Sequence, residues 1–281
     1  MLRFQSKILK NKRRVFIYLP PNYPLLKGPS LPVLYMQDGQ NLFSNTCHEV
    51  PFQWNLDKVA DSLISRGSVP PFMIVGPANT PYREYEYTHA TDDSFKVGGW
   101  ADRYLDFLTE ELMPFIESNY PVCPLRRTTF LGGSSLGGLL SLYAAFTRYE
   151  SFGGFIATSP SIWWDSFSII EVMDKSNLSN DSIRLWLDIG RREMKGQYIQ
   201  GQYCRPLKAY RYLDDFLFEK GFQSKRNYYY YEQRLGTHDE KSWGKRMTKA
   251  LPFLFKNLGL RRCSTDIDAG ERLFRELEAQ I

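Results

Sequence analysis

A short run of glycine and serine between a predicted strand and a predicted helix constrains this chain most. The run is GGSSLGG at residues 132–138. Residues 127–131 before it are typical of a short buried strand, and residues 139–146 after it form an apolar helical segment. A serine with a glycine two positions before and after it suits a sharp strand-to-helix turn, where close packing excludes side chains. Only Ser135 fits this frame, so it is the candidate nucleophile.

Composition indicates one ordinary globular domain. The chain has 281 residues, of which 43% are hydrophobic and 24% charged, enough for a large core in a single α/β domain. Its net charge of +5 is spread along the chain, so we expect no nucleic-acid partner. It contains no apolar run of about 18 residues, so we expect no membrane span.

The N-terminus and the cysteines favour a cytoplasmic protein. Residues 1–5 lead into polar and basic residues and have no signal-peptide core. Cys47, Cys123, Cys204 and Cys263 lie far apart, without the spacing of a zinc site. We therefore expect reduced thiols rather than disulfides, and no bound metal or cofactor.

Strands and helices are predicted to alternate along the chain. The predicted strands are residues 3–9, 13–19, 32–37, 72–76, 127–131, 154–158, 183–188 and 227–232, and the predicted helices are 55–65, 98–120, 139–146, 203–220 and 243–255. The first two strands should pair antiparallel at an edge. The others predict a mostly parallel sheet with helices on both faces, within a domain of residues 1–258. Residues 259–281 predict a helical tail packed on the domain or on a partner, which would allow a homodimer.

Histidine is the usual base for a serine nucleophile, and the chain has His48, His89 and His238. Only His238 follows Ser135, which suits the order serine, acid, histidine of α/β-hydrolases. It also follows the tyrosine-rich strand at residues 227–232, where a loop at the carboxyl end of that strand is expected. His238 is therefore the candidate base.

Two carboxylates could orient the histidine. Asp188 ends the strand 183–188, and Glu193 lies in the loop after it. A loop residue can lean toward the loop of His238, whereas a strand-end side chain follows the pleat of its strand. We therefore favour Glu193 and keep Asp188 as the alternative.

An oxyanion needs backbone donors, and two amides are candidates. One is the amide of Leu136, directly after the nucleophile. The other is the amide of Gln40, in the Asp-Gly-Gln turn after strand 32–37. Trp163 and Trp164 follow the strand 154–158 and are candidates to line the substrate pocket, with burial in the core as the equal alternative.

Six motifs in this order give a family resemblance. They are Asp38-Gly39-Gln40, Arg83-x-x-Glu86-Tyr87-Thr88, Gly133 to Gly138, Ser159-Pro160 before Trp163-Trp164, Gly190-x-x-Glu193 and Gly236-x-His238. Over residues 5 to 256 the chain resembles the α/β-hydrolases of the "putative esterase" family, which includes esterase D, feruloyl, acetylxylan and siderophore esterases and mycolyltransferases. The resemblance implies the α/β-hydrolase fold with little or no cap, a triad of Ser135, Glu193 and His238, and Gln40 as second oxyanion donor. The chain departs from the family at His89, often proline, and at the basic pair before Glu193.

The function predicted from these residues is hydrolysis of carboxylic esters of small molecules or carbohydrates through an acyl-enzyme. Acyl transfer to a sugar or alcohol is the alternative, because the same triad serves both reactions and only the acceptor differs. A catalytically silent binding module is a third hypothesis, which the complete set of nucleophile, base and oxyanion donors argues against. The residues do not identify the acyl or alcohol group.

Overall fold

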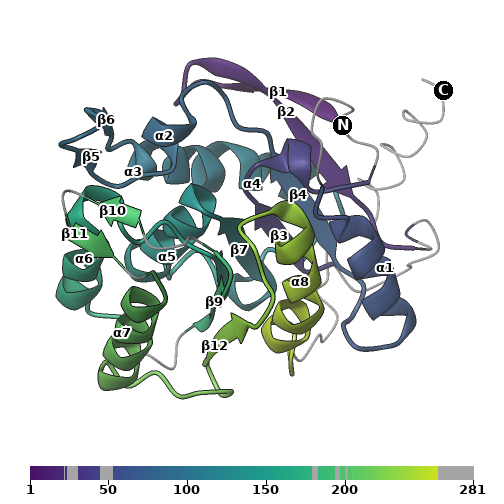
Figure 1. The fold of residues 1–281 in the computed structure, drawn as a ribbon. Helices are drawn as coiled ribbons and strands as arrows, with labels where there is room; N and C mark the ends of the chain where they lie inside the picture. The colour runs from purple at the N-terminus through teal and green to yellow at the C-terminus, as the bar shows by residue number, and fades with distance from the viewer. Residues whose placement is uncertain are drawn as a thin grey trace.

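A computed structural model describes residues 1–21, 23, 31–44, 53–178, 183–193, 197–199, 202–204 and 206–258. These residues form an eight-stranded sheet in the order β1-β2-β4-β3-β7-β8-β9-β12 (Figure 1). Its strands are β1 (Leu2–Ser6), β2 (Asn11–Tyr18), β3 (Val33–Met36), β4 (Met73–Pro77), β7 (Thr129–Ser134), β8 (Gly154–Thr158), β9 (Arg184–Gly190) and β12 (Tyr228–Gln233). The predicted tail at residues 259–281 lies outside the described residues.

The pairing of the strands confirms the predicted fold class. β2 is antiparallel to both β1 and β4, and every pair from β4 to β12 is parallel. Parallel strands direct their carboxyl ends to the same edge of the sheet, so the loops after β3, β7, β8, β9 and β12 converge there. This convergence builds the site described below.

Helices cover both faces of the sheet, because alternate side chains of its buried strands point to opposite sides. In β9, Leu185 and Leu187 join one hydrophobic cluster and Trp186 joins the other. One face packs against α1 (Leu56–Ser65) and α8 (Glu240–Leu254). The other packs against α3 (Ala101–Asp106), η3 (Phe107–Leu112), α4 (Met113–Asn119), α5 (Leu136–Thr147), α6 (Ile169–Lys175) and α7 (Pro206–Glu219).

Prolines shape two of the predicted helices, and the sequence predicts a kink or break at Pro114 within residues 98–120, because proline cannot donate to the helical ladder. The long helix predicted over residues 98–120 is divided by a wide turn of π-helix, η3, directly before α4. Pro114 lies in the first turn of α4 and lacks the N–H that would continue the regular ladder. The helix predicted over residues 203–220 begins only at Pro206, because proline suits the first turn of a helix. Tyr203 belongs instead to a strand, β11 (Gln202–Cys204), paired with β10 (Gln197–Ile199).

The prediction of four reduced thiols is wrong, because Cys123 is disulfide-bonded. Wide spacing along the sequence did not exclude a pairing, since folding brings distant segments together. One of the grounds for expecting a cytoplasmic protein is thereby removed. In the described part of the chain, every helix is too short or too polar to cross a bilayer.

Candidate active site

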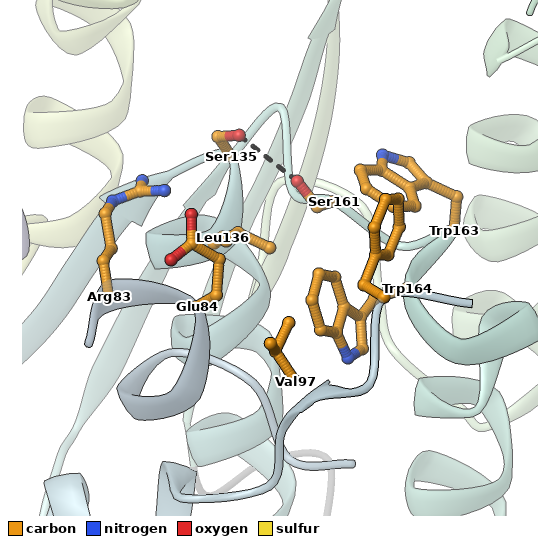
Figure 2. A pocket seen from close by; sticks show the side chains of 9 residues that line it. Arg83, Glu84, Val97, Ser135, Leu136, Ser161, Trp163 and Trp164 are labelled. Carbon is orange, nitrogen blue, oxygen red and sulfur yellow. Dashed lines mark hydrogen bonds between the residues drawn. The ribbon is translucent and has the colours of Figure 1, made fainter. Parts of the chain in front are cut away.

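Ser135 stands at a strained turn between β7 and α5. Its φ is 56° and its ψ is −121°, a conformation that costs energy for any residue with a side chain. Its amide donates to the carbonyl of Thr158 (3.1 Å), and its carbonyl accepts from the amide of Ser161 (3.0 Å). A Cβ added to Gly133 would lie 2.6 Å from the backbone of Gly137, so glycine is required at this crossing. The hydroxyl of Ser135 therefore has a fixed position above the sheet (Figure 2).

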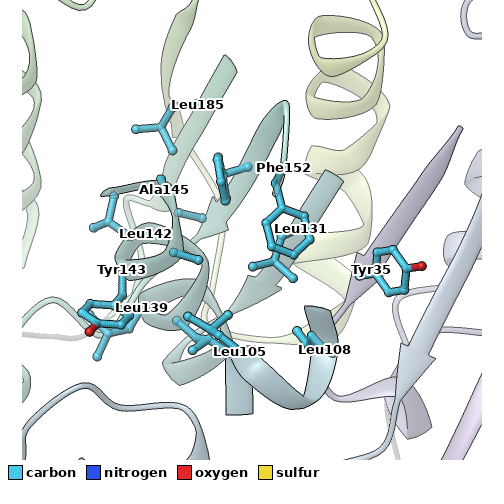
Figure 3. Close-up of a cluster of buried hydrophobic side chains, with 14 of the residues drawn as sticks. Tyr35, Leu105, Leu108, Leu131, Leu139, Leu142, Tyr143, Ala145, Phe152 and Leu185 are labelled. Carbon is cyan, nitrogen blue, oxygen red and sulfur yellow. The ribbon is translucent and has the colours of Figure 1, made fainter. Parts of the chain in front are cut away.

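The helix after Ser135 is anchored on all sides. Residues 136–146 of α5 are all buried, and they pack against β7 and the helices beside it (Figure 3). Leu139 and Leu142 are among its fully buried side chains. Because this helix cannot shift without opening the core, its N-terminus holds the Leu136 amide beside the serine. The first amides of a helix have no intrahelical acceptor and favour negative charge, as an oxyanion donor requires.

His238 contacts Glu193 at the neighbouring strand ends. His238 Nδ1 lies 2.9 Å from Glu193 Oε2, and the imidazole is 38% exposed. The ring packs edge-on against Trp243 with centroids 4.9 Å apart. β9 and β12 are paired in parallel up to Gly190 and Gln233, so the loops carrying Glu193 and His238 leave the sheet side by side. The strand register thus brings these two side chains together.

A buried arginine connects both carboxylates that the sequence suggested. Arg246 of α8 donates from Nη1 to Asp188 Oδ1 (2.6 Å) and from Nη2 to Glu193 Oε1. The side chains of all three residues are fully buried. Asp188 Oδ2 accepts from the indole N–H of Trp186 (2.7 Å), and none of the contacts found among the described residues joins Asp188 to His238. Asp188 thus anchors α8 to the sheet through Arg246.

Three donors occupy the other oxygen of Glu193. Oε1 accepts from Arg246, from the amide of Gly190 (2.8 Å) and from the hydroxyl of Ser159 (2.7 Å). Burial alone would raise the pKa of Glu193, but the hydrogen bond with His238 and the guanidinium of Arg246 hold that pKa below its ordinary value. The Glu193 carboxylate therefore stays ionised well below neutral pH, with Oε2 left for the imidazole.

The loop after β3 lies beside the N-terminus of α5. A Cβ on Gly137 would contact Gln37 Cβ at 2.9 Å and would come within 3.6 Å of Asp38 Oδ2. Asp38 has a left-handed backbone (φ 56°), and its carboxylate binds Arg83 through two bonds of 2.8 Å. Gly39 is pressed against the carbonyl of Gly76 and leaves no space for a Cβ. These constraints fix the turn that carries Gln40.

A cavity of about 480 Å³ opens in front of Ser135 (Figure 2). Trp163 and Trp164 both line it, and Trp164 is also almost fully buried, so the core and pocket alternatives are both true of this residue. The other lining residues are Arg83, Glu84, Phe95, Val97, Ser135, Leu136 and Ser161. Phe95, Trp163 and Trp164 form an aromatic wall of the cavity that faces the serine. Arg83 and Glu84 form a charged rim.

The serine hydroxyl contacts a residue that sequence reasoning did not identify. Ser135 Oγ lies 3.2 Å from Ser161 Oγ, and no hydrogen bond to His238 occurs within the described part of the chain. Ser161 is 3% exposed. Its only sequence signal was its place in the Ser159-Pro160 segment before the tryptophans, and Arg246, eight positions after His238 on α8, had none.

His89 is partly buried between α5 and the residue that precedes α6. Its ring stacks on Tyr143 with centroids 5.1 Å apart, and Nε2 lies 2.9 Å from the hydroxyl of Ser168. Nδ1 is buried without a hydrogen-bond partner among the described residues. Burial lowers the pKa of His89 to about 4, because the charged imidazolium would lose its hydration.

This depressed pKa predicts a stability difference between neutral and acid pH. Between pH 6.5 and 4 the unfolded chain binds a proton at His89 that the folded chain does not, so stability falls as the pH falls through this window. The effect of this one group is about 3 kcal/mol. We expect the stability advantage of the wild type over His89→Gln to shrink by that amount between pH 7.5 and pH 4, measured by urea unfolding. An equal difference at both pH values would contradict this.

Comparison with known proteins identifies the family. The model of the family described as "Putative esterase" matches residues 6–254. The chain belongs to this family. The esterase is 28% identical to the uncharacterized protein YbbA of Bacillus subtilis, over 86% of this chain and 92% of that protein. It is 34% identical to the siderophore triacetylfusarinine C esterase of Aspergillus fumigatus, over 51% of this chain and 48% of that protein.

A solved structure supports the fold independently. The IroE-like serine hydrolase of Shewanella oneidensis superposes with a TM-score of 0.73 over 99% of this chain and 86% of its own, at 22% identity. That similarity shows the α/β-hydrolase fold alone. Membership of the family, with relatives named as esterases, makes this chain a carboxylic ester hydrolase. The predicted family, fold and enzyme class are thus confirmed.

Proposed function

We propose that the esterase cleaves carboxylic esters through an acyl-enzyme on Ser135, with His238 as general base and Glu193 as the acid that orients it. The contact of Glu193 Oε2 with His238 Nδ1 carries the proposal. It holds the proton on Nδ1 and leaves Nε2 as the basic nitrogen. A base in this tautomer is what a serine nucleophile requires.

In the first half of the reaction, Ser135 Oγ attacks the ester carbonyl carbon and its proton passes to His238 Nε2. The hydroxyl can accept from Ser161, 3.2 Å away, while its own proton points to His238. The amides of Leu136 and Gln40 bind the oxyanion of the tetrahedral intermediate. The intermediate then collapses, the alcohol leaves with the proton from His238, and the acyl group remains on Ser135.

In the second half, a water molecule attacks the acyl-enzyme. His238 takes a proton from the water, the second tetrahedral intermediate uses the same amides, and the carboxylic acid leaves as the proton returns to Ser135. The ionised Glu193 stabilises the imidazolium in both halves. The A. fumigatus relative is named for a siderophore ester, so we propose esters of bulky, multifunctional acids or alcohols as substrates.

A fluorophosphonate probe tests the proposed nucleophile. The probe should form one covalent adduct at Ser135, and Ser135→Ala should remain unlabelled and should not hydrolyse any ester of a panel of acetyl, feruloyl and siderophore esters. Ser134→Ala is the matched control, because Ser134 is the neighbouring buried serine and should leave labelling intact. Intact wild-type protein without an adduct would refute the proposal.

A further inference from the structure

A buried carboxylate outside the proposed triad connects the two segments that make the aromatic wall. Phe95 and Val97 come from the hairpin of β5 (Thr91–Asp92) and β6 (Val97–Gly98), and the two tryptophans come from the turn before α6. The ring of Phe95 stacks on Trp164 with centroids 5.9 Å apart and an interplanar angle of 18°. The wall therefore exists only while the hairpin and the turn keep their relative positions.

Asp92 is the residue at their junction. It is 3% exposed, although it is an aspartate in a surface hairpin. Its Oδ1 accepts from the amides of Ser94 (2.8 Å) and Phe95 (3.0 Å), which shapes the hairpin turn. Its Oδ2 accepts from the amide of Asp165 (2.9 Å), in the turn that follows the tryptophans. One side chain thus holds both halves of the wall.

The turn at Asp165 needs such an anchor. Asp165, Ser166 and Phe167 have φ values of 44°, 54° and 66°, three successive left-handed residues that are not glycine. Each of them is strained, so the backbone favours another path unless contacts hold it. A further bond, from the indole N–H of Trp164 to the carbonyl of Ala90 (2.9 Å), also joins this turn to the strand leading into Asp92.

We propose that Asp92 is a positioning residue that sets the selectivity of the esterase for esters with a planar aromatic group. Phe95, Trp163 and Trp164 offer ring faces and edges opposite Ser135, and such surfaces favour flat rings over small aliphatic groups. None of the contacts of Asp92 found among the described residues reaches the proposed triad, so it acts on binding of the aromatic group rather than on the bond-breaking steps. This inference rests on the proposed function.

The variant Asp92→Asn isolates the link between hairpin and turn. The amide oxygen of asparagine can still accept from Ser94 and Phe95, but its NH₂ group then faces the N–H of Asp165, donor against donor. We expect KM for ethyl benzoate and phenyl acetate to rise by about tenfold, as loss of one buried hydrogen bond would give. We expect kcat for these esters, and kcat/KM for ethyl acetate, to stay within about threefold of wild type, because the nucleophile and its partners are untouched.

Two further variants control the result. Asp93→Asn removes a neighbouring carboxylate whose side chain is 90% exposed. It should leave KM unchanged for both ethyl benzoate and phenyl acetate. Phe95→Ala removes a ring of the wall that is 58% exposed, and it should reproduce the selective rise in KM. Equal losses on aromatic and aliphatic esters, or an unchanged KM for the aromatic esters in Asp92→Asn, would overturn the proposal.

A binding measurement separates this proposal from the proposed reaction. Ethyl benzoate titrated into Ser135→Ala should quench tryptophan fluorescence, and adding Asp92→Asn to that variant should weaken the apparent affinity by the same factor of about ten. If the wild type hydrolyses no ester but this difference in affinity appears, the proposed function fails and the role of Asp92 stands. If esters are hydrolysed and the affinities are equal, the role of Asp92 fails alone.

Discussion

Replacing Glu193 by glutamine is expected to lower kcat by roughly 10³- to 10⁴-fold with little change in KM. The reason is in the hydrogen bonds of its two oxygens. Oε1 faces three donors, from Arg246, Gly190 and Ser159, so the carbonyl oxygen of a glutamine must take that position. The NH₂ group then faces His238 Nδ1, which must become the acceptor. The proton moves to Nε2, and the imidazole can no longer accept the proton of Ser135.

Asp188→Asn is the matched control, since it makes the same chemical change in the carboxylate that the sequence left as the alternative acid. Asp188 contacts Arg246 and Trp186 rather than His238, so kcat should stay within about tenfold while the stability falls. Steady-state kinetics on a chromogenic ester, with urea unfolding for each variant, decides whether Glu193 or Asp188 is the acid. A larger loss of kcat in Asp188→Asn than in Glu193→Gln would assign the acid to Asp188.

Replacing Arg246 by methionine is expected to cost about 3–5 kcal/mol of unfolding free energy at pH 7. Methionine fills a similar volume, but it leaves two fully buried carboxylates without their cation. Burial already raises the pKa of Asp188 even with Arg246 in place. In the variant that carboxyl can protonate as the pH falls, so the deficit should be smaller at pH 5 than at pH 7.

Lys245→Met supplies the control for charge. Lys245 is an exposed neighbour of Arg246 on the same helix, and its replacement removes one positive charge without exposing a buried partner. Urea unfolding at both pH values should show less than about 1 kcal/mol of change for it. If the two variants lost equal stability, the network of Arg246 would not carry the energy assigned to it.

Local constraints made part of this molecule predictable from sequence. The turn at Ser135 needs glycines because backbone crosses backbone there, and such a need leaves a short motif. The buried strands needed only continuous apolar runs, and β8 was predicted with its observed bounds. The placement of His238 after the last strand followed from chain order alone.

Contacts between segments that are distant in the sequence were much harder to predict from it. The hydrogen bond between Asp92 and Asp165 joins residues 73 positions apart, and neither residue type predicts it. The helical periodicity of α8 predicts a core-facing side chain at position 246, where an arginine is rare. Only the structure shows that two buried carboxylates pair with it. The disulfide at Cys123 was missed for the same reason, because spacing along the chain does not report proximity in space.

The substrate-binding wall and the proposed catalytic residues lie on different parts of the fold. The groups proposed for the chemistry stand on the carboxyl ends of hydrogen-bonded parallel strands, whereas the aromatic wall belongs to a short hairpin and a turn outside that ladder. Mutations in the hairpin and the turn can therefore alter which esters fit without weakening the sheet that supports the nucleophile. A library restricted to Phe95, Val97 and Trp163, which line the cavity and are not fully buried, would therefore vary the substrate while leaving the core intact.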